Sequence, residues 1–118
     1  MRIDTERLAD ILDAVQRIRR HVKVGDLHRF QQDEVLQSAV LRWFEIIGEA
    51  SRGLTDQFRQ EHPQVPWREI SDMRNRVTHG YFDIDLDIVW NTIMNDLPTL
   101  EDAVISWLPP SEHATASH

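Results

Sequence analysis

One segment, residues 32–53, limits what the chain can fold into more than any other part of the sequence. Its apolar residues recur at helical spacing and cover more than half of the circumference of the predicted helix. They are Val35, Leu36, Ala39, Val40, Trp43, Phe44, Ile46, Ile47 and Ala50. A helix with so wide an apolar surface needs partners on two sides. The segment is therefore either the centre of a helical bundle or part of a subunit interface.

Helical spacing continues on both sides of this segment. Residues 4–22 carry one apolar stripe with steps of three and four residues, and Gly25 is predicted to end that helix. Residues 55–62 predict a short helix with Thr55 as its N-cap, and the run HPQVPW breaks it. Both predictions place amphipathic helices beside the broadly apolar one.

Prolines and a glycine divide the C-terminal half. Pro66 suits the first turn of a helix, where its missing N–H needs no partner, and this helix is predicted to run to about His79. Gly80 is its predicted stop. The last helix is expected to start between residues 83 and 85 and to end near residue 108. Pro98 lies inside it, so a kink or a break is expected there.

These segments predict an all-α, up-and-down bundle of four main helices and one short helix. We find no strand-like alternation and no internal repeat. We expect one helical domain over residues 1–108, because 118 residues is close to the usual size of a single domain. The polar run PPSEHATASH predicts a flexible tail over residues 109–118.

Composition excludes several classes of protein. The chain has no cysteine, so disulfides and thiolate metal sites are excluded. No apolar run approaches the roughly 20 residues that span a bilayer, and the N-terminal residues lack the apolar core of a signal peptide. We therefore expect a cytoplasmic protein with no membrane association.

The net charge of −7 argues against a general affinity for nucleic acid, but the charge is unevenly distributed. Residues 1–76 hold all 13 Lys and Arg side chains and 13 of the 20 acidic ones. Residues 77–118 hold the other seven acidic side chains and no Lys or Arg. The acidity thus belongs to the C-terminal third, and the sequence leaves room for a local basic surface elsewhere.

Three familiar site motifs fail on inspection. The run GEASRG has glycines at phosphate-loop spacing, but no Lys-Ser/Thr follows and the run lies in a predicted helix. The run DIDLDIVW begins like a calcium loop, but Ile88 and Met94 stand where Gly and Glu are required. No two of the six histidines have the spacing of a zinc helix motif. We therefore expect no metal site.

The run RNRVTHGY, Arg74 to Tyr81, gathers side chains suited to phosphate chemistry. On one helix Arg74 and His79 would lie about 140° apart, whereas Arg76 and His79 would be neighbours. A histidine in the last helical turn is poised to exchange a proton near neutrality. Gly80 would let Tyr81 fold back beside it. Spacing alone favours a simpler alternative, in which Arg and His only complement the macrodipole and Tyr81 packs on the bundle.

The longer run from Gly48 to Trp90 resembles the HepT-like branch of the HEPN superfamily. That superfamily is marked by Arg, four to six residues, then His, with a polar residue often after the Arg. Arg74, Asn75 and His79 match this pattern, and Tyr81 matches the tyrosine that the HepT-like branch adds two residues later. Further matches are the GEA run, the Pro-x-x-Pro-Trp run, Asp85 and Trp90.

The resemblance implies a helical homodimer or higher assembly, in which the motifs of two subunits meet in a cleft. It implies a metal-independent endoribonuclease without a cofactor, the toxin of a toxin–antitoxin pair. Arg74 and His79 would be catalytic and Asn75 would bind phosphate, while Arg76 could hold the RNA backbone. The antitoxin would be a minimal nucleotidyltransferase that adenylylates Tyr81.

A second interpretation remains open. The chain could be a non-catalytic helical dimer that binds a nucleotidyltransferase or a nucleotide, with Arg74 and His79 serving binding alone. Cleavage of RNA in EDTA, lost in His79→Ala, would separate the two.

Overall fold

The computed structural model describes residues 2–78 and 83–109, and everything said below of the structure concerns these residues. They form helices and no strand, apart from one isolated bridge, so the all-α class is confirmed for this part of the chain. The elements are α1 Arg2–His21, α2 Leu27–Gln32, α3 Glu34–Arg52, α4 Asp56–Glu61, α5 Trp67–Ser71, α6 Met73–Arg76, α7 Leu86–Asn91, the π-helical turn η1 Thr92–Asp96 and α8 Leu97–Trp107.

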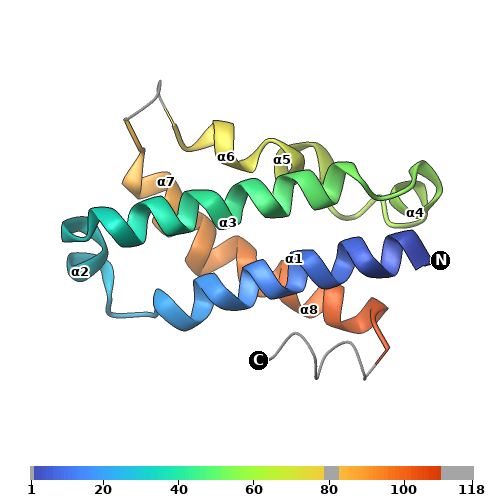
Figure 1. Cartoon of the computed structure of the whole chain (residues 1–118), viewed down its shortest axis with the longest axis horizontal. Coiled ribbons are helices and arrows are strands. Elements are labelled where there is room, and N and C mark those ends of the chain that lie inside the picture. The colour runs from blue at the N-terminus through green and yellow to red at the C-terminus, as the bar shows by residue number, and fades with distance from the viewer. Residues whose placement is uncertain (1, 79–82, 110–118) are drawn as a thin grey trace.

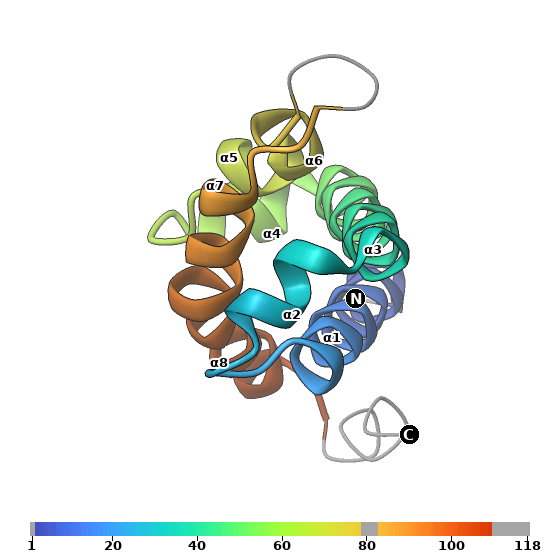
Figure 2. The ribbon, with the colours of Figure 1, turned by 90° about the vertical axis from the view of Figure 1, so that its left-hand side faces the viewer.

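The two longest helices, α1 and α3, run antiparallel and side by side (Figure 1). The consecutive elements α7, η1 and α8 form one continuous helical segment, which crosses behind α1 and α3 (Figure 1). Seen from the end, α1 and α3 form one side of the bundle, α7 and α8 form the other, and α2 lies across the opening (Figure 2). One hydrophobic core joins all of these elements, with Phe30 of α2 and Phe44 of α3 fully buried. The architecture therefore agrees with a helical bundle.

Helix α3 is the centre of the bundle. Its fully buried side chains include Val40, Phe44 and Ile47, and it contacts α1 on one side and α5 and α6 on the other. Of the two alternatives for the broadly apolar segment, the central position within one chain accounts for most of its apolar surface. Val35, at the start of α3, is 82% exposed and is the clear exception.

The predicted fourth main helix differs from the structure. Instead of one helix from Pro66 to His79, two short helices are broken at Asp72, and α6 ends at Arg76. The cause is tertiary, because the Arg52 guanidinium on α3 donates to the backbone oxygen of Ser71. That carbonyl is thereby engaged by a side chain instead of by the next helical turn.

The start of the bundle's second half follows the prediction more closely. The last helix was expected to start between residues 83 and 85, and α7 starts at Leu86, where the Asp85 carboxylate caps it by accepting from the backbone N–H of Ile88 at 3.1 Å. Pro98 does not break the helix. Its missing N–H is accommodated by the preceding π-helical turn, where the N–H of Leu97 bonds the oxygen of Thr92.

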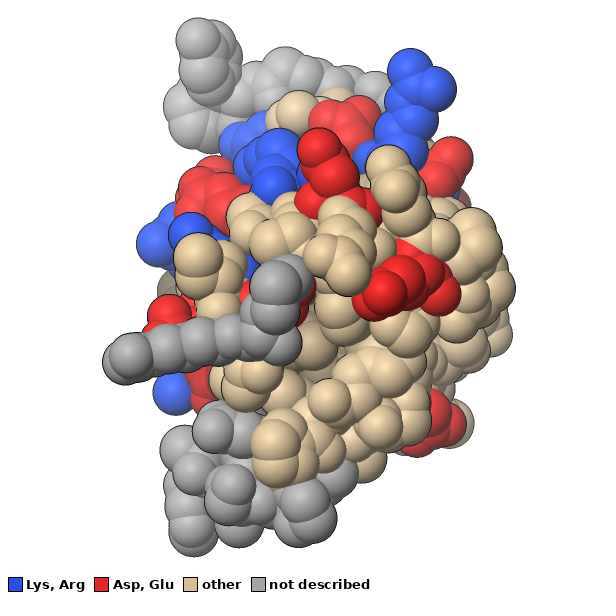
Figure 3. Space-filling model, turned by 90° about the vertical axis from the view of Figure 1, so that its right-hand side faces the viewer, with Lys and Arg blue, Asp and Glu red and all other residues tan. Residues whose placement is uncertain are grey.

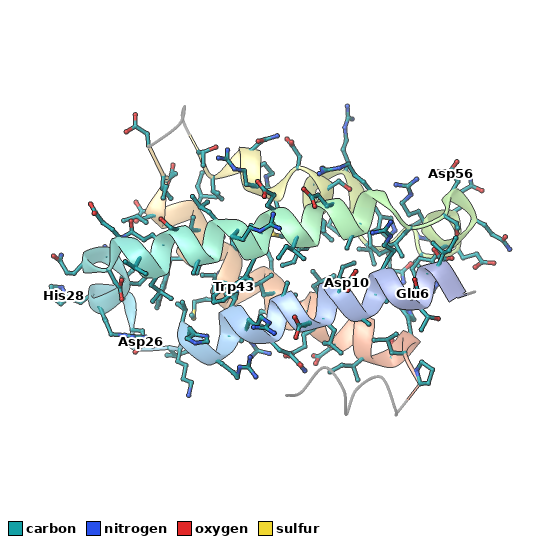
Figure 4. All side chains as sticks on the ribbon, viewed as in Figure 1. Glu6, Asp10, Asp26, His28, Trp43 and Asp56 are labelled. Carbon is teal, nitrogen blue, oxygen red and sulfur yellow. The ribbon has the colours of Figure 1, made fainter. Side chains whose placement is uncertain are left out.

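The turn between α1 and α3 holds a helix that the sequence did not predict. Gly25 was predicted to end the first helix, but α1 ends at His21, and Gly25, with φ at 96°, lies in the turn that follows. Helix α2 comes next, with Phe30 buried beneath it. The carboxylate of Asp26, labelled at this turn in Figure 4, accepts from the N–H of Lys23 at 2.9 Å and from Arg29 at 3.0 Å. The first of these bonds, and then the second, lower the pKa of Asp26 below its ordinary value of 3.8.

The opposite end is fixed by Asp4 of α1, which is only 3% exposed. One carboxylate oxygen accepts from the Thr55 N–H and the other from the Thr55 hydroxyl, each at 2.8 Å. The same hydroxyl accepts from the N–H of Phe58 and so caps α4, as predicted. The tail predicted beyond residue 109 lies outside the described residues. None of the described helices combines the length and apolarity that a membrane crossing requires.

Candidate active site

Arg74, Asn75 and Arg76 lie on α6, a helix of four residues that is anchored by its apolar neighbours. Met73 and Val77 flank the polar run and are 4% and 1% exposed. Because the anchors face the core, the three polar side chains between them are directed outward or sideways. The sequence thus builds a short polar segment on a buried base.

Arg74 is the most constrained of the three. Its side chain is half-buried, and its Nη1 donates to Oγ1 of Thr78 at 3.1 Å. It borders a small cavity of about 160 Å³ between α3 and the junction of α5 and α6. Asn75 borders the same cavity, and its amide donates to Oδ1 of Asp72 at 2.9 Å. The structure therefore brings Arg74 and Asn75 together.

Arg76 lies elsewhere. It borders a groove of about 440 Å³ whose other wall is formed by η1 and α8, including Asp96 and Leu100. Helical spacing made Arg76, not Arg74, the neighbour of residue 79, but α6 has already ended at Arg76. Within one chain, the structure does not bring Arg76 to the cavity that Arg74 and Asn75 border.

His79 and Tyr81 lie outside the described residues, so their predicted roles are not tested by these contacts. The chain on both sides of them is described. Thr78 and Ile84 form an antiparallel bridge, and the N–H of Asp85 donates to the oxygen of Val77 at 2.7 Å. Residues 78 and 84 therefore lie opposite each other, and the covalent neighbour of His79 is fixed directly beside the Arg74 guanidinium.

Helix α3 contributes a second arginine that the sequence analysis missed. Arg52 borders the cavity with Arg74, and its guanidinium donates to the oxygen of Ser71. The approach of the two segments is close at Gly48, where a Cβ would lie 2.8 Å from the Ser71 oxygen. The GEASRG run is thus a packing and positioning segment. Gly48, which lies one helical turn before Arg52, was the only sequence signal available for the role of Arg52.

The cavity is not a simple basic pocket. Glu45, Glu49 and Asp72 also border it, so its two guanidinium groups are matched by three carboxylates. Two of these carboxylates have partners, because Glu45 accepts from Arg42 at 2.5 Å and Asp72 accepts from Asn75. The end of the molecule that carries α4 shows the same mixture of charges over its upper part (Figure 3). Any anion bound here would be selected by a few directed donors and not by a broad positive field.

The part of the chain that the structure describes holds no group of three or more His, Asp or Glu side chains that could bind a metal ion. Asp85, which the calcium-loop pattern would have used as a ligand, caps α7. This supports the reading of the DIDLDIVW run as an acidic helix start.

Comparison with known proteins places the chain in a family. A family model described as "Ribonuclease HepT-like" matches residues 11–106. A protein of Thermococcus cleftensis named "Probable ribonuclease HepT" is 38% identical over 94 residues, which cover 80% of this chain and 86% of that protein. "Putative RNase TTE0752" of Caldanaerobacter subterraneus is 40% identical over 97 residues, covering 82% and 87%. "Putative RNase MJ1380" of Methanocaldococcus jannaschii is 37% identical over 97 residues, covering 82% and 89%. No solved structure matches.

An all-α bundle that carries an Arg-x4-His motif, here Arg74 to His79 with Asn75 after the arginine, is typical of the HEPN class. The chain belongs to the HepT-like family of that superfamily. The family resemblance read from residues 48–90 is therefore confirmed.

Proposed function

We propose that this chain is a metal-independent endoribonuclease and the toxin of a toxin–antitoxin pair. Membership of the HepT-like family and the ribonuclease names of its relatives support ribonuclease activity. The observation that carries the proposal is the Arg74 guanidinium, which is fixed beside the residue that precedes His79. Arginine has five N–H donors, and the hydrogen bond to Thr78 engages one of them. Among the described residues the other donors have no further hydrogen-bond acceptor, and they are available to meet a phosphodiester.

The reaction is an internal transesterification of RNA. The ribose 2′-oxygen attacks the adjacent phosphorus, so that a 2′-O–P bond forms and the P–O5′ bond breaks. His79 takes the proton from the 2′-hydroxyl or supplies one to the departing 5′-oxygen. Arg74 stabilises the charge that builds on the phosphoryl oxygens, and Asn75 orients the phosphate. The products are a 2′,3′-cyclic phosphate and a free 5′-hydroxyl.

Two copies of the chain would complete the site in a homodimer or larger assembly. Arg76 borders the α8 side of α6, away from the cavity that Arg74 borders. RNA that contacts both arginines must therefore either extend across α6 or meet Arg76 of a second copy. Val35, exposed on the central helix, is one apolar side chain that such an assembly could cover.

Neutralisation by a cognate minimal nucleotidyltransferase is the regulatory half of the proposal. Transfer of AMP to Tyr81 would attach a phosphate three residues from Thr78, and hence near Arg74. The added negative charge would compete with the RNA phosphate for the same guanidinium. After co-expression with the partner, the proposal expects a mass increase of one or more AMP units on the peptide that contains Tyr81. A label on another residue would contradict it.

Purified chain, free of its partner, tests the activity. We expect RNA cleavage in excess EDTA, with loss of cleavage in His79→Ala and Arg74→Ala. Arg59→Ala is a matched control, because Arg59 pairs with Asp56 on α4, at the end where Thr55 bonds Asp4. Cleavage that requires Mg²⁺, or that survives in His79→Ala, would contradict the mechanism. No cleavage by unmodified chain would favour the non-catalytic binding dimer.

A further inference from the structure

We propose that Thr78 is a positioning residue for Arg74, which its hydroxyl holds in the orientation needed at the scissile phosphate. The inference rests on the proposed ribonuclease function and adds a residue to it. Thr78 was not among the residues that the motif or the sequence pattern singled out.

The Thr78 hydroxyl bonds Arg74 in two compatible ways, as an acceptor from the guanidinium and as a donor to the backbone oxygen. Nη1 of Arg74 lies 3.1 Å from Oγ1 of Thr78, whereas that hydroxyl lies 3.4 Å from the backbone oxygen of Arg74. Thr92 provides the contrast, because its hydroxyl donates to the oxygen of Ile88, also four residues earlier, at 2.8 Å. Thr92 makes the ordinary bond of a threonine to its own helix. Thr78 makes a longer form of that bond and also accepts from the guanidinium of Arg74.

The backbone fixes the Thr78 hydroxyl in space. Thr78 pairs with Ile84 in an antiparallel bridge, and the preceding Val77 is 1% exposed and accepts from the N–H of Asp85 at 2.7 Å. A β-branched side chain has few χ1 rotamers once its backbone is fixed. The acceptor offered to Arg74 is therefore rigid, although Arg74 itself carries a long, flexible side chain.

A rigid acceptor matters because arginine loses side-chain conformational entropy when it is ordered. An arginine already ordered in the free protein avoids this cost at the transition state, and a donor displaced by about 1 Å can cost roughly 100-fold in rate. Thr78 would thus act on the chemical step through Arg74, without contacting RNA.

Two substitutions at one position test the role. Thr78→Val keeps the branched shape and removes the acceptor, and we expect kcat to fall about tenfold with KM changed less than about twofold. Thr78→Ser restores the hydroxyl and should restore kcat. Thr92→Val is the matched control, since it removes a threonine hydroxyl from another helix, and it should keep the wild-type kcat per folded molecule. Wild-type kcat in Thr78→Val, or an equal loss in Thr92→Val, would overturn the proposal.

A double variant separates positioning from general structure. If Thr78 acts only through Arg74, adding Thr78→Val to Arg74→Ala should lower kcat no further. A further loss equal to that of the single variant would show that Thr78 acts independently, and would overturn the proposal.

A spectroscopic measurement keeps this inference distinct from the ribonuclease itself. In nitrogen-15 spectra of arginine side chains, assigned with Arg74→Lys, we expect slow rotation of the Arg74 guanidinium in wild type and in Thr78→Ser. Rotation should become fast in Thr78→Val. An unchanged rate in Thr78→Val would overturn the positioning role even if RNA is cleaved. Restricted rotation in a chain that cleaves no RNA would overturn the proposed function and leave the contact established.

Discussion

Two threonines at different places in the bundle, Thr55 and Thr78, each meet a charged side chain, and the two pairs differ in every other respect. Thr55 meets Asp4, which lies 51 residues away and is 3% exposed. Both oxygens of that carboxylate are engaged by Thr55 at 2.8 Å. Thr78 meets Arg74, four residues away, through one bond at 3.1 Å on a half-buried side chain.

The difference separates a structural contact from a candidate functional one. A buried carboxylate with both oxygens satisfied stabilises the native state and has little left to offer a ligand. A half-buried guanidinium held at one corner contributes less to folding but is already ordered, with donors free for a substrate. We therefore expect substitutions at Asp4 to affect stability and those at Arg74 to affect activity.

The largest expected effect is on catalysis at Arg74. Arg74→Ala removes a donor aimed at developing charge, which typically lowers kcat about 100- to 1,000-fold. We expect its unfolding free energy to stay within about 1 kcal/mol of wild type, since its hydrogen bond to Thr78 is partly exposed. Single-turnover cleavage and urea unfolding of the same preparation measure both. If Arg74→Ala lost as much unfolding free energy as an Asp4 variant, the distinction between the structural and the functional contact would be contradicted.

Asp4 should show the reverse pattern. Asp4→Ala leaves the partly buried Thr55 N–H without its acceptor, and we expect a loss of about 1–3 kcal/mol in unfolding free energy. Cleavage per folded molecule should not change. Asp13→Ala is the control, because Asp13 makes only a partly exposed ion pair with Arg17, and such pairs contribute about 0–1 kcal/mol. Equal losses in the two variants would contradict the structural role of Asp4.

Substitution of Gly48 is expected to affect both stability and cleavage. Gly48→Ala would bring a Cβ within 2.8 Å of the Ser71 backbone oxygen, so α3 and α5 must separate. We expect about 1–3 kcal/mol of destabilisation together with reduced cleavage, because the same junction carries Arg74. Gly53→Ala is the matched control, since the atoms nearest to the added Cβ belong to the flexible side chain of Arg7. Greater damage in Gly53→Ala would contradict this packing.

The smallest effect is expected at Asp26, the exposed carboxylate of the α1–α2 turn. Its pKa is lower in the folded chain, so its charge stabilises the fold above the ordinary pKa of 3.8, and this stabilisation disappears as pH falls through the folded value. Asp26→Asn should therefore lower the melting temperature slightly at pH 7, and the difference should vanish in acid. A difference independent of pH would assign the effect to something other than charge.

The sequence predicted the parts of the fold that are local. The stripe of residues 4–22, the cap at Thr55 and the start of the last helix near residue 85 each depend on neighbours within one or two turns, and all were found. Two features were missed, one because its cause is remote and the other because the helix is short. The break at Asp72 depends on Arg52 reaching Ser71 from another helix. Helix α2 is six residues long and buries Phe30 alone, which is too little for a periodic signal.

The candidate site likewise has residues that the sequence predicted and one that it did not. Arg74 and Asn75 were predicted from the motif, and the structure places both at one cavity. The prediction that the helix runs to about residue 79 was wrong, because the antiparallel bridge at Thr78 is a non-local feature. The contribution of Thr78 depends on that bridge, so no spacing rule applied to RNRVTHGY could have found it.

The central claim is that the ribose 2′-hydroxyl is the attacking group on a phosphodiester gripped by Arg74 and His79. The most direct test compares the cleavage of two substrates in EDTA. One is an RNA that the purified chain cuts, and the other is the same RNA with a single 2′-deoxy sugar at the cut site. The account predicts a 2′,3′-cyclic phosphate end from the first substrate and no cleavage of the second at that position. Cleavage of the 2′-deoxy substrate at the same bond would contradict it.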